Sequence, residues 1–528
     1  MTNRVFTAGG LLVGLLAVWL FARAVHAPYL SDDSYQYLDA AQSAAAGECL
    51  CTHIAHFDEQ VASGRMPVPF THFPPGYSLL MAALSFAGLS LKTAGFLLSA
   101  VSFLVTLWLI WDIGFTLGAK PWAIAALSLL WVTNSEALAD ASRVGTEALF
   151  TAAVTALAAL IARDIRNGGS RPALLLGLGS VAGAAYGIRY AGLFLMPVAG
   201  IYLISRWRRT PAAKWGAVDG LFAIAALAGA IMIRNIVYTG SWRGGFSTGV
   251  HRSVRLVLVE SFKSYYHLVF GGRVVARFDV WAVILGISLA LTFFMIFRLR
   301  RDREQHGLPK FTAVAWGWLG AMLATYVAGI MLTGLLTIAD DMTRYNRPVY
   351  PLVLAAAAPL LSTALRGKWI AVGIAMVGAI IVIHSRSLEV APHVERHVLA
   401  DEMLNREVQP GTTARAWLLG HVPPGGVVVA ADGQAVEFLL HRNVISVIEP
   451  QYTARGTDER GYRMLMSQSH ARYLLLFPGL SPKDAPEQDN TPFLRDLVTG
   501  ATAAPEWLPL AVRNSAVAIY ECPSCPDH

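Results

Sequence analysis

Runs of mainly apolar residues, each close to the length that crosses a bilayer, recur along this sequence and limit the folds open to it. A helix crosses the hydrocarbon with about 20 such residues. Of the 528 residues, 55% are hydrophobic and 15% charged, which excludes an ordinary soluble domain. The sequence therefore predicts an α-helical polytopic membrane protein with about 11 transmembrane helices. We interpret the first run, 5–26, as a retained span and not a cleaved signal. The other runs are 92–117, 121–138, 145–162, 172–187, 190–205, 215–238, 279–297, 311–337, 348–364 and 369–383.

Short basic clusters between the runs indicate which loops face the cytoplasm. The apolar segment 77–89 is too short to cross, so we expect it at the interface. With the N-terminus inside, four basic clusters then fall on the cytoplasmic side and the C-terminal tail lies outside. These clusters are 163–171, 206–214, 298–310 and 366–368. The net charge of +7 is thus typical of cytoplasmic loops and not of a nucleic-acid-binding protein. The loop 239–277 is an exception, because it is basic and external; an anionic ligand or a lipid surface would explain it.

The composition becomes more polar after residue 383, and no later run is long enough to span. We expect a transmembrane domain over 1–385 and a soluble, extracytoplasmic α/β domain over 386–528, which covers or shapes the external face. Four segments of the second domain are predicted to be short buried strands. They are "GGVVVAAD" (425–432), "NVISVIEP" (443–450), "RYLLLFPG" (472–479) and "AVAIYEC" (516–522).

The four cysteines form two close pairs, Cys49 with Cys51 and Cys522 with Cys525. Neither pair has companion ligands at the spacing of a structural zinc site. Each pair can form a disulfide bond if the pair lies outside the cytoplasm.

The predicted topology collects ionisable residues at the external face. Asp32 and Asp33 lie there, as does His72, which is either a loop residue or a phosphate contact. Snorkelling to the headgroups ordinarily explains one arginine at the end of a span. Five on one face beside two acids favour an anion site, since guanidinium groups match phosphate oxygens. The five are Arg143, Arg189, Arg234, Arg344 and Arg347.

The two aspartates have a structural and a chemical interpretation. Ser31, Asp32 or Asp33 is expected to cap a helix over 35–46 that Gly47 closes. Capping does not need two aspartates, so one remains as a general base toward a hydroxyl.

Six segments, in order over most of residues 1–365, together resemble the GT-C class of polytopic glycosyltransferases. The resemblance is strongest to the bacterial relatives of the protein O-mannosyltransferases and of the lipid A aminoarabinose transferases. It implies a multi-pass protein of the bacterial inner membrane. With the topology predicted from the basic clusters, the N-terminus then lies in the cytoplasm and the C-terminal domain in the periplasm. The segments are "SDDSYQYLDAAQSAAAGE" (31–48), "HFPPGYSLL" (72–80), "ASRVGTEALF" (141–150), "IRYAGLFLMPV" (188–198), "IRNIVYTGS" (233–241) and "RYNRPVYPLV" (344–353).

Such enzymes transfer a sugar from a polyprenyl-phosphate carrier to a hydroxyl acceptor, with an aspartate of the first external loop near the reacting centre. Asp33 matches that aspartate if Tyr37 is its partner in a D-x-x-x-Tyr pattern, and Asp32 matches it if the pair replaces an Asp-Glu pair; we favour Asp33. Arg143 and Glu147 match an external element whose arginine meets the carrier phosphate. The family also keeps polar residues at further positions around the cavity in which the sugar is transferred. These positions match Arg189, Arg234 with Asn235, and Arg344 or Arg347.

The resemblance implies an inverting single displacement with an aspartate base and arginines at the leaving phosphate. The expected partners are the lipid-linked sugar donor, an acceptor that is a lipid, glycan or protein, and membrane lipid, but no nucleic acid. No cofactor is expected, although a divalent cation at the aspartate pair stays open. Two other classes also stay open. A transporter or lipid flippase usually has ionisable groups at mid-membrane and internal repeats, and a non-catalytic scaffold would tolerate loss of Asp33.

Overall fold

The computed structural model divides into two compact units. The first comprises Met1–Pro28, Gly95–Ile231 and His251–Ala391, and the second comprises Tyr29–Ala94, Met232–Val250 and Pro392–His528. The residues that the structure describes are 13–19, 22, 28–55, 60, 66–169, 171–244, 253–270, 310–336, 342–364, 378, 396–447, 457–481 and 486–525.

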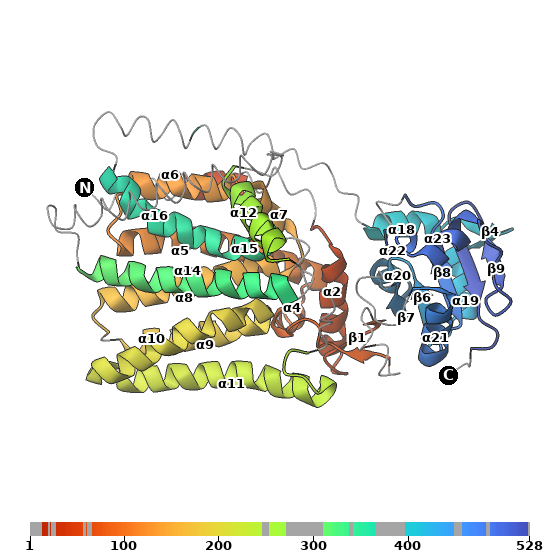
Figure 1. Ribbon diagram of the computed structural model, residues 1–528, viewed down its shortest axis with the longest axis horizontal. Coiled ribbons are helices and arrows are strands. Elements are labelled where there is room, and N and C mark those ends of the chain that lie inside the picture. The colour runs from red at the N-terminus through yellow and green to blue at the C-terminus, as the bar shows by residue number, and fades with distance from the viewer. Residues whose placement is uncertain are drawn as a thin grey trace. The chain divides into compact units, whose positions relative to one another are not determined.

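The first unit is helical, and Figure 1 shows its long helices side by side. Its core is apolar, and α8 packs against α9 and α14 within it. The start of α5 and the end of α11 belong to the second unit. The elements are α5 (Leu91–Thr116), α6 (Pro121–Val132), α7 (Ser135–Ser142), α8 (Thr146–Arg166), α9 (Pro172–Ile188), η1 (Tyr190–Phe194), α10 (Met196–Arg209), η2 (Pro211–Ala213), α11 (Lys214–Thr239), α12 (Val254–Phe270), α14 (Lys310–Leu336), α15 (Met342–Asn346), η3 (Arg347–Val349) and α16 (Tyr350–Ala364).

Several helices are long and apolar enough to cross a membrane, which confirms the multi-pass class. Within the described residues there are 5 such spans, or 6 if α6 and α7, bent by 62°, form one broken span. The five are Leu91–Thr116, Thr146–Arg166, Tyr190–Arg209, Pro211–Thr239 and Phe311–Leu335. The predicted runs 5–26, 279–297 and 369–383 lie largely or wholly outside the described residues, so the count of about 11 stays a prediction. The segment at 77–89 forms α4 (Gly76–Ser85), a helix too short to span, as expected.

Helices α9 and α11 approach backbone to backbone. A Cβ added at Gly179 would lie 2.0 Å from the carbonyl oxygen of Gly220. Small residues allow this close packing between membrane helices. The two glycines therefore set the distance between α9 and α11.

The second unit contains a six-stranded sheet in the order β2-β7-β6-β8-β10-β9. Strands β2, β7, β6 and β8 are parallel, and β10 and β9 complete the sheet antiparallel. The elements are α2 (Asp32–Ala45), β1 (Cys51–Thr52), β2 (Ile54–Ala55), β3 (Val68–Pro69), α4, α18 (Arg396–Leu404), β4 (Glu407–Gln409), β5 (Thr412–Thr413), α19 (Ala414–His421), β6 (Val427–Ala430), α20 (Gly433–Leu440), β7 (Asn443–Ser446), α21 (Glu459–Ser469), β8 (Tyr473–Leu476), α22 (Pro486–Asp489), α23 (Pro492–Thr499), β9 (Leu510–Arg513) and β10 (Ala518–Glu521).

All four segments predicted as strands form strands: β6, β7, β8 and β10. Continuous apolar runs are typical of strands buried on both faces, and every residue of β6, β7 and β8 is buried. The edge strand β2 was not predicted, because it comes from much earlier in the chain. Residues 54–55 thus join the first polar segment of the protein to the C-terminal sheet.

Both cysteine pairs are disulfide-bonded and both belong to the second unit. Cys49–Cys51 leads into β1, and Cys522–Cys525 follows β10.

Candidate functional site

The predicted site residues divide between the two units. The first unit holds Arg143, Glu147, Arg189, Arg344 and Arg347, and the second holds Asp32, Asp33, Tyr37, His72, Arg234 and Asn235.

Glu147 is the centre of the first group. It lies in the first turn of α8, and its carboxylate is buried. Arg189 Nη1 donates to Glu147 Oε1 at 2.8 Å, and Arg344 Nε donates to the same oxygen. A Cβ added at Gly145 would lie 2.6 Å from Glu147 Oε2, so the glycine leaves room for this carboxylate. Glu147 therefore joins residues that are far apart in the sequence.

Arg347 organises a second set of ion pairs in the same unit. Its guanidinium is buried, donates to Glu136 Oε2 at 2.6 Å and also pairs with Asp140. Arg143 Nη1 lies 3.9 Å from the other oxygen of Asp140. Asp140 was not predicted as a site residue from the sequence. It lies one helical turn before Arg143, and this spacing, at which side chains on a helix can pair, was the signal that could have identified it.

We refer to Glu136, Asp140, Arg143, Glu147, Arg189, Arg344 and Arg347 as the arginine cluster. Its four guanidinium groups exceed its three carboxylates by one positive charge. The side chains of Arg143 and Arg344 are 23% and 25% exposed, whereas that of Arg347 is 3% exposed. The paired acids hold the guanidinium groups in place, and the partly exposed ones are suited to bind an anion.

The second group begins with Asp32 and Asp33 in the first turn of α2. Ser31 is the N-cap residue: its N–H donates to Ser34 Oγ at 2.8 Å, and the two hydroxyl oxygens lie 3.0 Å apart. The prediction of Ser31 as the N-cap is therefore confirmed, and the alternative predictions of Asp32 or Asp33 as the N-cap are wrong. Both carboxylates lie near the positive end of the helix dipole and both are partly exposed.

Tyr37 and His72 belong to one aromatic cluster. The buried ring of Tyr37 contacts Phe70, Phe73 and Tyr77, with centroids 6.1, 5.0 and 5.4 Å away. The ring of His72 packs edge-on against Phe73 at 4.7 Å. The cluster packs α2 against α4 and the segment before it.

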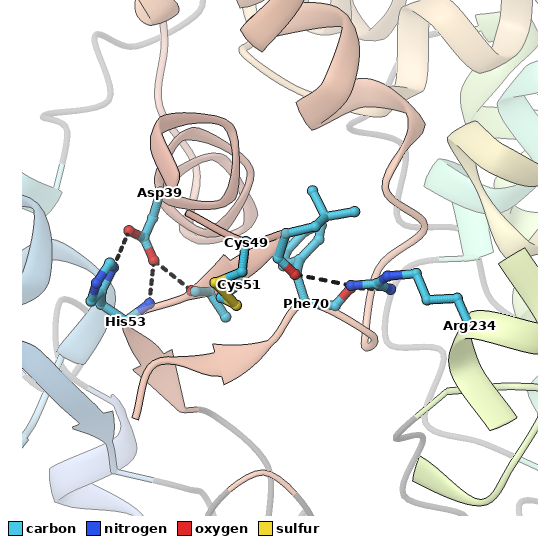
Figure 2. The surroundings of a disulfide bond; sticks show 8 residues. Asp39, Cys49, Cys51, His53, Phe70 and Arg234 are labelled. Carbon is cyan, nitrogen blue, oxygen red and sulfur yellow. Dashed lines mark hydrogen bonds and ion pairs between the residues drawn. A yellow bond between two sulfur atoms is a disulfide. The ribbon is translucent and has the colours of Figure 1, made fainter. Parts of the chain in front are cut away.

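Arg234 binds backbone in this structure, as Figure 2 shows. It donates to the carbonyl oxygens of Phe70 and Leu50, each at 2.9 Å. The neighbouring Asn235 is buried and donates to the carbonyl oxygen of Trp242 at 3.2 Å. The two bonds of Arg234 fix one end of the β1–β3 ribbon. The predicted contact of Arg234 and Asn235 with a carrier stays a prediction.

A further polar group, which the sequence did not reveal, lies on α2 and the turn between β1 and β2. Asp39 Oδ1 lies 2.8 Å from His53 Nδ1 (Figure 2). This hydrogen bond raises the pKa of His53 above 6.5, although burial opposes it. Burial and the nearby charge of Asp39 raise the pKa of Glu437 in α20 well above 4.5.

No family model and no curated protein matches the sequence, but solved structures match the fold. ArnT from Cupriavidus metallidurans in the apo state superimposes with a TM-score of 0.55 and 14% identity over 98% of this chain and 97% of that one. The same protein bound to undecaprenyl phosphate superimposes with a TM-score of 0.56 and 13% identity over 97% of each chain.

A second solved structure is the oligosaccharyltransferase of Archaeoglobus fulgidus, with a TM-score of 0.53 and 10% identity over 90% of this chain and 69% of that one. A third is the mycobacterial arabinofuranosyltransferase AftD, with a TM-score of 0.53 and 12% identity over 99% of this chain and 40% of that one. All of them are GT-C glycosyltransferases. The chain therefore has a GT-C-like fold, which confirms the resemblance drawn from the sequence; identities this low establish the fold alone.

Proposed function

We propose that this protein is an integral membrane glycosyltransferase that moves a sugar from a polyprenyl-phosphate carrier to a hydroxyl group of a lipid, glycan or protein. The observation that carries the proposal is the fold shared, over 97% of both chains, with ArnT bound to undecaprenyl phosphate. The arginine cluster supports it, because partly exposed guanidinium groups suit a lipid phosphate.

Asp33 is assigned as the general base. Its carboxylate takes the proton of the acceptor hydroxyl while that oxygen bonds to the anomeric carbon, and the bond from that carbon to the carrier phosphate breaks. The polyprenyl phosphate leaves with the electron pair of the broken bond. A single displacement inverts the anomeric centre. Asp32, beside it in the first turn of α2, is the alternative base.

Arginine side chains stabilise the leaving phosphate. Arg143, Arg189 and Arg344 are assigned to this contact because each is partly exposed. Arg347 is buried between two carboxylates, which supports a positioning role. Glu147 orients two of the arginines, and the remaining predicted contacts to donor or acceptor are assigned to Tyr37, His72, Arg234 and Asn235.

The chemistry assigned here needs no nucleotide and no cofactor, since the carrier phosphate is already a leaving group. We place the protein in the bacterial inner membrane, with its N-terminus in the cytoplasm and the α/β part of the second unit in the periplasm. The two disulfides of the second unit support this orientation, because disulfides persist in oxidising compartments.

The experiment uses the full-length protein in sealed proteoliposomes with undecaprenyl-phosphate-linked sugars, labelled in the sugar, as a panel of hexose and pentose donors. An inner-membrane lipid extract and an envelope glycan fraction supply acceptors. We expect label to move to an acceptor, with one undecaprenyl phosphate released per sugar transferred. Empty liposomes are the control.

A polytopic transporter or lipid flippase is the competing function. It would carry the intact labelled donor to the opposite leaflet and release no undecaprenyl phosphate. That result would replace the transferase proposal, and a scaffold would give neither product release nor transport.

A further inference from the structure

Three side chains of the second unit converge on one point outside the residues assigned to transfer. Asp39, His53 and Glu437 each offer one ligand atom, and these atoms all lie within 4.8 Å of one another. They come from α2, from the turn between β1 and β2, and from α20. All three segments belong to the same compact unit.

The backbone around this point is fixed. The carbonyl oxygen of His53 accepts from the N–H of Val444 at 2.8 Å, and β2 pairs in parallel with β7 directly after it. Asp39 Oδ2 accepts from Thr52 Oγ1 at 2.7 Å and from the N–H of His53. Helix α2 also packs against α20. The three ligand atoms are therefore presented by a preformed scaffold.

Glu437 has no structural explanation of its own. It is only 6% exposed, and none of the described residues forms a hydrogen bond or an ion pair with its carboxylate. An unpartnered buried carboxylate is costly, and a second carboxylate nearby adds repulsion unless a cation or a proton lies between them. Asp39 is that second carboxylate, so the point where the three side chains meet is suited to a cation.

We propose that Asp39, His53 and Glu437 bind a Zn²⁺ ion. Zinc takes imidazole nitrogen and carboxylate oxygen as ligands, and this set of one nitrogen and two oxygens matches that preference. Ligand atoms around a tetrahedral zinc lie about 3.3 Å apart. His53 Nδ1 and Asp39 Oδ1, now 2.8 Å apart, need to separate only slightly. The His53 side chain is 33% exposed, which leaves the fourth position open to water.

The bound ion would act as a clamp between the first polar segment and the C-terminal sheet. Helix α2 carries Asp32 and Asp33 in its first turn and Asp39 two turns later. A metal on Asp39 and Glu437 therefore ties the helix that bears the acid pair to α20. This site does not depend on the proposed transferase activity, and its test reads metal binding and not turnover.

The experiment uses full-length, tag-free protein in detergent, treated with a chelator and then dialysed, and titrates Zn²⁺ by calorimetry. We expect one equivalent to bind with a dissociation constant below about 1 μM. Glu437→Gln and His53→Gln should each weaken this binding at least tenfold, since loss of even an indirect contact to a metal costs that much. Glu402→Gln, an exposed substitution, is the matched control and should bind as the wild type does.

Thermal melting of the same samples shows which variants are folded and gives a second readout. Zn²⁺ should raise the melting temperature of the wild type and of Glu402→Gln, but not of Glu437→Gln or His53→Gln. The proposal is overturned if the wild type binds no equivalent of Zn²⁺ in this range. It is equally overturned if either folded variant binds the ion as tightly as the wild type.

Discussion

Glu147 joins two arginines that lie far from it in the sequence of the first unit. Its buried carboxylate pairs with Arg189 and Arg344, which lie 42 and 197 positions later in the chain. The sequence predicted these residues as members of one site, because each is an ionisable group at the end of an apolar run. It could not predict which charges pair, since pairing depends on how the helices pack.

Replacing Glu147 tests this pairing. Glu147→Gln leaves two guanidinium groups without their common counter-charge, and we expect the free energy of unfolding to fall by about 3–5 kcal/mol. Melting in detergent with intrinsic fluorescence measures the change. Glu136→Gln is the matched control: its side chain is 38% exposed and Arg347 keeps Asp140, so the expected loss is at most about 1 kcal/mol. Equal losses in the two variants would contradict the central place of Glu147.

Helices are the elements that the sequence predicts best, because apolar length is a local property. The described helices α5, α8 and α14 lie within about two residues of the predicted runs 92–117, 145–162 and 311–337 at most of their ends. The run 121–138 was predicted as one span, but the break between α6 and α7 was not predicted. The bend comes at Thr133 and Asn134, where the Asn134 side chain caps α7 by accepting from the N–H of Ala137 at 2.9 Å.

Helix α9 offers a test of packing between elements. Gly179→Ala places a methyl group against the Gly220 carbonyl, so α9 and α11 must separate, and we expect a loss of about 1–3 kcal/mol in stability. Gly177→Ala, in the same helix, meets only Leu160 at 3.9 Å and should be neutral or slightly stabilising. Melting of both variants in detergent is the measurement, and an unchanged Gly179→Ala protein would show that the helices do not meet there.

At the scale of the whole molecule, local sequence predicted much less. The strands β6, β7, β8 and β10 could be recognised from their apolar runs, but the edge strand β2 has only two residues and pairs with a strand almost 400 positions later. Asp39, His53 and Glu437 come together for the same reason. Contacts of this kind depend on chain topology, which residue patterns do not encode locally.

Sugar transfer with Asp33 as the general base is the central proposal for this protein. The most direct test compares the initial rate of undecaprenyl phosphate release from the labelled donor by the wild type, Asp33→Asn and Asp32→Asn, each checked by melting. We predict that Asp33→Asn is slower by about 10²–10⁴-fold, the usual contribution of a general base, while Asp32→Asn stays within about tenfold of the wild type. A folded Asp33→Asn protein that releases undecaprenyl phosphate at the wild-type rate would contradict it.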